Sequence, residues 1–340
     1  MHMPVKQSLL AKHFTEDVAS ELRRAKTNRG FSLDDITRSG VENPDSSIGV
    51  YAPDAESYEV FWGLFGPIIA EYHNIENVDS LAHPQDMTIK PGQFTGAELY
   101  RDRVISTRAR VGRNLDGFAL TPGMSLDERL EVERRVVDAL SKLPDDLAGT
   151  YHSLADLDEE TRNKLIEDHV LFKQGDRFLE SAGVNRDWPA GRGIFLSNDK
   201  KFIVWVNEED HLRIISLEQG GDLLSVYSRL VRAISEIEKN VPFAYTQQLG
   251  YLSSCPTNLG TAMRASFHMK LPALEKSGEL DDFAKLLGLS VRGIHGEHSE
   301  SVGGVYDISN KRRLGLSERD AIVGLHVGAR RLATEEELRK

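Results

Sequence analysis

Apolar residues recur at helical spacing in the N-terminal part of the chain. In Ser8–Lys26 they are Leu9, Leu10, Phe14, Val18 and Leu22, and the segment Tyr58–His73 repeats the pattern. Spacings of three and four residues bring such side chains to one face of a helix, so each segment is predicted to be a helix. Asn43–Gly49 lies between them and is rich in turn-forming residues, which predicts a loop.

Three later segments have the pattern of amphipathic helices. They are the run from Ser125 to Leu143, Asp222–Lys239 and Ser317–Leu332. The first opens with a capping box, because Glu128 follows Ser125 by three residues and can bond back to its amide. In the second, apolar side chains fall on one face.

Two short segments are predicted to be strands. Phe202–Val206 and Leu212–Leu217 are rich in β-branched and aromatic residues. They flank the acidic segment Asn207–Asp210, which is therefore predicted to be a turn at the end of an antiparallel pair. Strands and long helices do not alternate regularly along the chain, which favours an α+β fold over a doubly wound sheet.

Residues 75–102 are predicted to link two domains. They contain two prolines and two glycines, and their apolar residues keep no period. This assignment leaves a small helical domain at residues 1–74 and a larger one at residues 103–340. A chain of 340 residues is long enough for both.

The charge balance excludes some classes of partner. The chain has 42 Lys and Arg residues against 53 Asp and Glu residues, a net charge of −11, which argues against nucleic-acid binding. No stretch approaches the roughly 18 consecutive apolar residues of a membrane span, and no signal-peptide pattern is seen. The single cysteine excludes an internal disulfide and fits a cytoplasmic enzyme. No Cys/His set has the spacing of a metal site.

Scattered arginines nevertheless predict a polyphosphate site. Arg108 and Arg110 alternate with small residues, so in a strand they face the same side. Arg213 lies in the predicted strand after the acidic turn, and Arg264 and Arg292 lie in two separate segments further along the chain. A guanidinium matches phosphate oxygens with two parallel hydrogen bonds. Each arginine alone is more often a surface or ion-pair residue, so the prediction depends on the joint pattern.

A second set of residues suits a cationic, planar acceptor. Glu209 lies in the acidic turn, and Cys255 is the sole thiol. A chain that has both a polyphosphate set and a set for a cation is predicted to move a phosphoryl group between the two.

Four motifs resemble those of the phosphagen (guanidino) kinases. They are VISTRAR at 104–110, VNEEDHLRIIS at 206–216, CPTNLG at 255–260 and GGVYDISNKRR at 303–313. The resemblance runs from about residue 6 to the C-terminus and is greatest to the arginine kinases. It implies a small all-helical N-terminal domain and a larger domain with an antiparallel sheet flanked by helices. It also implies reversible transfer of the γ-phosphoryl group of MgATP to the guanidino nitrogen of L-arginine, giving ADP and phosphoarginine, an energy buffer.

The resemblance assigns catalytic roles to a few residues. Glu209 and Glu297 match the carboxylates that orient the guanidinium, with Glu209 as the base, and Cys255 matches a thiolate that contacts it. Arg213 and Arg292 complete the catalytic set. Mg²⁺ is expected to be held by phosphates and water, with Glu208 or Asp210 as candidate contacts and no dedicated protein cage.

The same resemblance assigns the nucleotide contacts to three segments and two further residues. They are Ser106, Thr107, Arg108, Ala109 and Arg110; Arg264, Ala265, Ser266, Phe267 and His268; Arg292, Gly293, Ile294, His295, Gly296 and Glu297; and His169 and Arg213. At His295 the family often has an arginine.

Ser47, Ile48, Gly49, Val50 and Tyr51 correspond to the segment that selects the acceptor. In arginine kinases its backbone receives the substrate carboxylate, and the tyrosine contacts the α-amino group. Ser47 and Ile48 replace a common glycine and valine, which keeps taurocyamine or another guanidine open as the acceptor.

Other family features imply that two domains close over the substrates. At position 72 the chain has a tyrosine, the residue type usual at this position in arginine kinases. Asp45 and Arg177 match a pair that bridges the domains, and the loops 46–51 and 292–300 are the expected moving parts. A protein-arginine kinase is less favoured, because that class lacks the helical domain that contains Tyr51. Monomer and homodimer both stay open.

Overall fold

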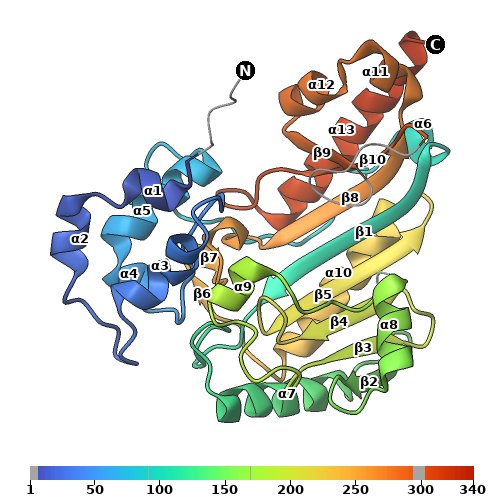
Figure 1. The fold of residues 1–340 in the computed structure, drawn as a ribbon. Coiled ribbons are helices and arrows are strands. Elements are labelled where there is room, and N and C mark those ends of the chain that lie inside the picture. The colour runs from blue at the N-terminus through green and yellow to red at the C-terminus, as the bar shows by residue number, and fades with distance from the viewer. Residues whose placement is uncertain (1–6, 91, 169, 294–302) are drawn as a thin grey trace.

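The computed structural model describes residues 7–90, 92–168, 170–293 and 303–340. A group of short helices, blue in Figure 1, lies beside a larger part built on one broad sheet. Helices pack on this sheet, and all of its strand pairs are antiparallel. The predicted α+β class and the antiparallel sheet are confirmed.

The N-terminal helices are shorter and more numerous than predicted. They are α1 (Leu9–His13), α2 (Glu16–Leu22), α3 (Leu33–Glu42), α4 (Ser57–Val60) and α5 (Trp62–His73). A single helix over Ser8–Lys26 was wrong, because Thr15 starts a new helix by accepting a hydrogen bond from the Val18 amide. Helix α3 was not predicted, and the segment Tyr58–His73 is interrupted at Phe61.

The large sheet has the strand order β2-β3-β4-β5-β1-β8-β10-β9. Its strands are β1 (Val104–Arg113), β2 (Gly149–Ser153), β3 (Gly193–Ser197), β4 (Phe202–Val206), β5 (Leu212–Gln219), β8 (Met263–Lys270), β9 (Leu289–Gly293) and β10 (Val305–Asn310). Two short strands, β6 (Tyr245–Thr246) and β7 (Gly250–Tyr251), pair separately. Strand β1 is central and pairs with β5 on one side and β8 on the other.

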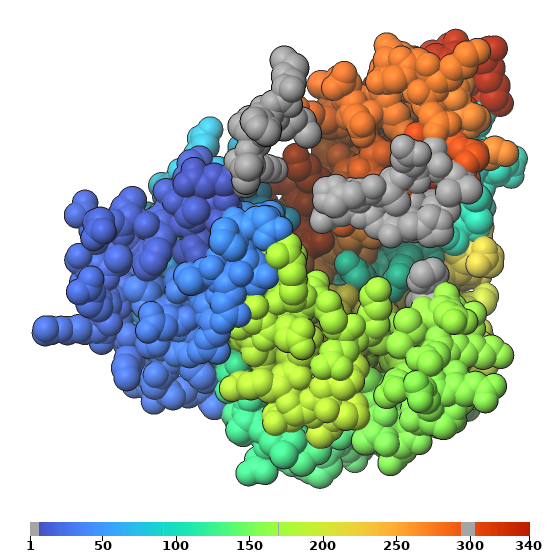
Figure 2. Space-filling model, in the orientation of Figure 1, coloured from blue at the N-terminus to red at the C-terminus, as the bar shows by residue number. Residues whose placement is uncertain are grey.

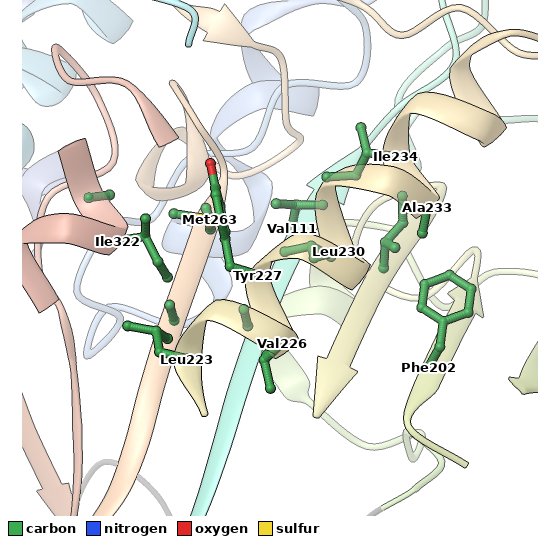
Figure 3. Close-up of a cluster of buried hydrophobic side chains, with 14 of the residues drawn as sticks. Val111, Phe202, Leu223, Val226, Tyr227, Leu230, Ala233, Ile234, Met263 and Ile322 are labelled. Atoms are coloured by element: carbon green, nitrogen blue, oxygen red, sulfur yellow. The ribbon is translucent and has the colours of Figure 1, made fainter. Parts of the chain in front are cut away.

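Helices cover one face of this sheet. They include α6 (Glu98–Arg101), α7 (Leu126–Leu140), α10 (Leu223–Glu238), α11 (Pro272–Ser277), α12 (Leu280–Leu286) and α13 (Glu318–Leu338). Helix α8 (Glu159–Glu167) packs on the other face, and α9 (Arg177–Ser181) lies beside the N-terminal helices (Figure 1). The predicted capping box of α7 is confirmed, although the helix ends at Leu140 instead of Leu143. Figure 3 shows Leu230 of α10 beside Val111 of β1.

The N-terminal helices share a hydrophobic core with loops of the larger part. Ile36, Leu64 and Phe65 are fully buried there, together with Leu120, Leu252, Leu259 and Leu314 from beyond residue 103. The short 3₁₀ helix η1 (Pro256–Asn258) contacts α5. Because this core joins the two parts, the N-terminal helices hold the loops that come together at the site described below. No helix in the described ranges is long and apolar enough to cross a membrane.

Glu336 of α13 anchors the start of α11, and its loss is expected to destabilise the fold. The carboxylate is fully buried and accepts hydrogen bonds from the amides of Ala273 (2.9 Å) and Leu274 (2.8 Å). Replacing Glu336 by alanine should lower the free energy of unfolding by about 2–4 kcal/mol, because two buried donors lose a charged acceptor. Urea unfolding would measure the change.

The matched control for this prediction is Glu337→Ala on the same helix. Glu337 is exposed and pairs with Arg103 and Lys340, so its loss is expected to cost at most about 1 kcal/mol. Equal losses in the two variants would contradict an anchoring role for Glu336.

Candidate active site

The acidic turn joins β4 to β5 and is fixed by Asn207. Its amide donates to the His211 carbonyl (2.9 Å), and its buried side-chain amide donates to the carbonyls of Arg129 (3.1 Å) and Gly191 (2.7 Å). Asn207 has a φ of 55°, in the left-handed region that asparagine tolerates better than most residues. The chain therefore turns at Asn207 and presents the next two carboxylates beyond the end of the sheet.

Glu209 is a carboxylate whose pKa is raised to about 7. Burial is the main cause, and the negative charges of Asp210 and Glu208 add to it, while Arg213 and Arg110 oppose it. Arg213 donates to Glu209 Oε2 (2.8 Å) and contacts Glu208 Oε1 (3.0 Å). A carboxylate with a pKa near neutrality can accept a proton in a reaction near pH 7.

Asp210 has a structural position in the turn. It is buried, and its oxygens accept hydrogen bonds from Asn114 Nδ2 (2.8 Å), Ser253 Oγ (2.8 Å) and the Ser254 amide (3.0 Å). Most of its hydrogen-bonding capacity is used within the protein, which favours Glu208 over Asp210 as the candidate Mg²⁺ contact. Within the described residues, no group of three or more His, Cys, Asp or Glu side chains is placed to hold a metal ion.

Cys255 lies at the start of η1 and is buried. Its Sγ is 3.1 Å from the Thr257 hydroxyl. Burial raises the pKa of the thiol to about 12, the charge of Glu209 adds to this, and the Thr257 hydrogen bonds oppose it. A thiolate at Cys255 therefore requires a cation beside it, and a guanidinium bound between Glu209 and Cys255 would supply that charge.

Asn258 and Arg313 also belong to the site, although the sequence analysis gave them no role. Asn258 Nδ2 donates to Glu209 Oε1 (3.2 Å), and Arg313 donates to Asn258 Oδ1 and to the Thr257 carbonyl. Both residues lie inside motifs that carry the family resemblance, and this was the available signal. Asn258 thus joins the segment that contains Cys255 to the carboxylate of Glu209.

A cavity of about 750 Å³ lies over the open face of the sheet. Arg108 and Arg110 of β1 reach it side by side, and the register places them opposite Ser266 and Arg264 of β8. Its lining also includes Ser106, Thr107, His268, Arg292, Gly293 and Asp307. Figure 2 shows a hollow between the green and orange parts of the surface.

The arginines of this cavity repel one another. Burial lowers the pKa of Arg110 well below its usual value, and the charges of Arg213, Arg108 and Arg264 lower it further. The pKa of Arg108 falls to about 10 for the same reasons, and its buried Nε has no hydrogen-bond partner among the described residues. Such a surplus of positive charge suits a multiply charged anion.

The remaining predicted nucleotide residues fall into three groups. Ala109, Ala265 and Phe267 are fully buried in the core on the opposite face, so only their backbone can contribute to the cavity. Arg213 adjoins the cavity through Arg108 and Arg110. His169, Ile294, His295, Gly296 and Glu297 lie outside the described residues.

The predicted acceptor segment lies against α1 and α3. The carbonyls of Ser47 and Ile48 accept hydrogen bonds from the amides of Leu9 (3.0 Å) and Leu10 (2.9 Å). A side chain at Gly49 would place its Cβ 2.8 Å from Leu10 Cβ, and Gly49 has a φ of 84°, so glycine is required there. No described residue accepts a hydrogen bond from the amides of 47–50, which leaves them available for an anionic group.

Tyr51 follows this segment and lies near Cys255 and Glu209. Burial raises the pKa of its hydroxyl, and the nearby Cys255 and Glu209 raise it further. The Tyr51 amide donates to the Ile36 carbonyl (3.1 Å), which fixes its backbone on α3. The predicted acceptor segment, carboxylate and thiol therefore meet in space.

Direct contacts join the N-terminal helices to α9. The predicted pair of Asp45 and Arg177 is confirmed, and both side chains are more than half exposed. Arg177 also contacts Asn43 Oδ1 (3.3 Å), and Ser39 Oγ donates to the Phe178 carbonyl (2.8 Å). Exposed pairs of this kind are worth about 0–1 kcal/mol, so they adjust the relative position of the parts more than their stability.

Comparison with known proteins gives consistent matches. Residues 131–339 match the family model of the ATP:guanido phosphotransferase C-terminal catalytic domain, and residues 4–70 match that of the N-terminal domain. The arginine kinase of Anthopleura japonica is 50% identical over 343 residues, which cover 99% of this chain and 47% of that protein. The arginine kinase of Limulus polyphemus is 49% identical over 325 residues, covering 93% and 88% respectively.

A solved structure has the same fold. The substrate-free duplicated taurocyamine kinase from Schistosoma mansoni matches with a TM-score of 0.92 at 40% identity, covering 99% of this chain and 48% of that one. This chain thus spans about half the length of the Anthopleura and Schistosoma proteins and most of the Limulus protein.

Proposed function

The chain belongs to the ATP:guanido phosphotransferase family, and we propose that it transfers the γ-phosphoryl group of MgATP reversibly to the guanidino nitrogen of L-arginine. One observation carries the proposal: Glu209 lies near Cys255 and Tyr51, and it accepts a hydrogen bond from Arg213, which adjoins the arginines of the cavity. Residues 1–74 then form the domain that recognises the acceptor, and residues 103–340 form the domain that binds the nucleotide and contains the catalytic groups. Residues 75–102 link the two domains.

The nucleotide binds along the arginine-lined cavity. Arg108, Arg110 and Arg264 donate to phosphate oxygens, and their mutual repulsion is relieved by the phosphate charge. Ser106, His268 and Arg292 contact the rest of the nucleotide at the far end of β1. Mg²⁺, when bound to the phosphates, neutralises charge that develops between the β- and γ-phosphoryl groups.

The acceptor guanidinium binds against Glu209 and Cys255. A free guanidinium has a pKa of about 12.5–13.8, so deprotonation at pH 7 before attack would cost about 8–9 kcal/mol. Glu209 therefore takes the proton as the bond to phosphorus forms. Asn258, held by Arg313, fixes the angle of the Glu209 carboxylate.

The acceptor segment selects arginine by its amino-acid end. The amides of 47–50 receive the carboxylate, and Tyr51 contacts the α-amino group. Closure of the two parts around both substrates keeps water from the γ-phosphoryl group, which would otherwise be hydrolysed. The single cysteine is consistent with an enzyme that works in the reducing cytoplasm. The protein works as a monomer or homodimer.

A second candidate acceptor is taurocyamine. Ser47 and Ile48 favour it, since they replace the smaller residues common in arginine kinases and change the space beside the free amides. The higher identity to arginine kinases, at about 50% against 40%, favours arginine as the first choice.

Initial rates of ADP production with MgATP should be measured for L-arginine, taurocyamine, creatine and glycocyamine in parallel. We expect arginine to have the highest kcat/KM, because its carboxylate and α-amino group both find partners. Preference for taurocyamine would contradict the reading of the acceptor segment and leave the mechanism unchanged. Absence of turnover with all four would contradict the proposed function.

A further inference from the structure

Two hydroxyl groups hold the main-chain carbonyl of Glu209. Thr121 Oγ1 and Ser254 Oγ both donate to it, the latter at 3.0 Å. The two residues belong to different segments, and both are fully buried. The carbonyl of the catalytic residue is thus fixed from two directions.

Each of these segments is also bonded to the N-terminal domain just after Tyr51. The Ala52 amide donates to the Ser254 carbonyl (2.7 Å), and the Leu120 amide donates to the Pro53 carbonyl (2.9 Å). The acceptor segment therefore reaches Glu209 by two short routes, one through Ser254 and one through Leu120 and Thr121.

The contact between these segments is tight. A side chain at Gly123 would place its Cβ 2.2 Å from the Pro53 carbonyl oxygen, so the loop that contains Thr121 lies directly on Pro53. The Ser254 amide donates to Asp210 Oδ1 (3.0 Å), and Ser254 precedes Cys255. A displacement of Ala52 and Pro53 must therefore be followed by Glu209, its turn and the thiol.

We propose that Thr121 and Ser254 are positioning residues that couple the acceptor segment of the N-terminal domain to Glu209. The inference rests on the proposed function. An acceptor whose amino-acid end engages residues 47–51 pulls Ala52 and Pro53 into place, and the two hydroxyls transmit this position to the carboxylate. An acceptor without that end gains less from the coupling.

This coupling affects the rate because Glu209 must be aligned with the guanidinium of the acceptor. A misplacement of about 1 Å in a reacting group can lower a rate by about 10²-fold. With one hydroxyl removed the other still holds the Glu209 carbonyl, whereas removal of both leaves a buried carbonyl free to shift. We therefore expect the double variant to lose more than the product of the two single effects.

The test compares L-arginine with agmatine, which has the same guanidinium but no carboxylate. Thr121→Val, Ser254→Ala and the double variant are assayed with both acceptors. In the double variant we expect kcat/KM for arginine to fall by about 10²-fold. The loss with agmatine should be smaller, so the arginine-to-agmatine ratio should fall about fivefold or more, with the KM for MgATP within about twofold of wild type.

Controls separate positioning from general damage. Thr121→Ser and Ser254→Thr keep the hydroxyl and should restore the ratio. Thr37→Val removes another buried hydroxyl, which donates to the Leu33 carbonyl (3.0 Å) in α3, and should leave the ratio unchanged. If the double variant does not fold, as judged by thermal unfolding, the single variants carry the test, because each loses one of the two hydrogen bonds to the Glu209 carbonyl and should lower the arginine-to-agmatine ratio, by less than the double variant.

An unchanged arginine-to-agmatine ratio in the folded Thr121 and Ser254 variants would overturn this inference alone. A wild-type protein that phosphorylates no guanidine would overturn the proposed function instead.

Discussion

Replacing Glu209 by glutamine is expected to lower kcat by about 10²–10⁴-fold, the usual contribution of a general base. Glutamine keeps the size of the side chain and can still contact Arg213, but it cannot accept the guanidinium proton. The KM for MgATP should stay within about twofold, because the phosphate-binding arginines are unchanged. In the wild type, kcat/KM should decrease as the pH falls below about 7, the pKa of Glu209, because Glu209 must be ionised to accept the proton.

The same variant is expected to be more stable than the wild type at pH 8. The pKa of Glu209 is raised from 4.5 to about 7 in the folded protein. Below about pH 4.5 both the folded and unfolded states bind the proton. Between about pH 4.5 and 7 the unfolded state is ionised while the folded state still holds the proton, so stability falls over this range and the loss is complete above the folded pKa. Glutamine removes this loss, which is at most about 3 kcal/mol and smaller after allowance for solvent at the side chain.

Steady-state kinetics and thermal unfolding from pH 5.5 to 8.5 would check both effects. Glu133→Gln is the control, because Glu133 also has a raised pKa and lies outside the site, hydrogen bonded by the Tyr151 hydroxyl. It should leave kcat unchanged. A kcat within a few-fold of wild type in Glu209→Gln would mean that Glu209 does not act as the base.

Local patterns in the sequence were sufficient to predict the two strands that flank the acidic turn. Strand β4 begins and ends where its β-branched run does, and β5 extends two residues beyond its predicted end at Leu217. The alternation of Arg108 and Arg110 was enough to place both on one face, because the period of a strand is two. Features encoded by neighbours in the chain were therefore predictable.

The residues that support the turn were not predictable in this way. Asn114, Thr121 and Ser254 reach Asp210 or Glu209 across 44 to 96 residues of sequence, and no local spacing marks such contacts. The resemblance identified the residues proposed to touch substrate, but it did not identify Thr121 and Ser254, which contact Glu209 through its main-chain carbonyl. The break at Thr15 was missed because an N-cap hydrogen bond there outweighs a continuous apolar period.

Replacing Arg110 by methionine is expected to have the other large effect, a loss of about 10³–10⁵-fold in kcat/KM. Arg110 lies at the centre of the arginine cluster, next to Arg108 along β1 and opposite Arg264 on β8. The transferring phosphoryl group is loose and spreads its charge over its oxygens, so donors fixed around it supply most of the catalysis. Methionine fills similar space and donates nothing.

The thermal stability of the ligand-free protein should not fall with the rate in Arg110→Met. The fold buries Arg110 near four other guanidiniums, which is why its pKa is lowered, and methionine removes the cost of that burial and repulsion. The melting temperature without ligand should therefore stay equal or rise, while the increase caused by MgATP should shrink, because part of the binding energy comes from relief of this repulsion.

Kinetics and thermal unfolding with and without MgATP test the two statements together, with Arg134→Met as the control. Arg134 is exposed on α7 and pairs with Glu131, so its replacement should change neither quantity. Arg110→Lys keeps the charge and loses the planar fork, and it should recover part of the MgATP stabilisation but little of the rate. A lower melting temperature in ligand-free Arg110→Met would show that Arg110 stabilises the fold, and the repulsion argument for an anion site would then be wrong.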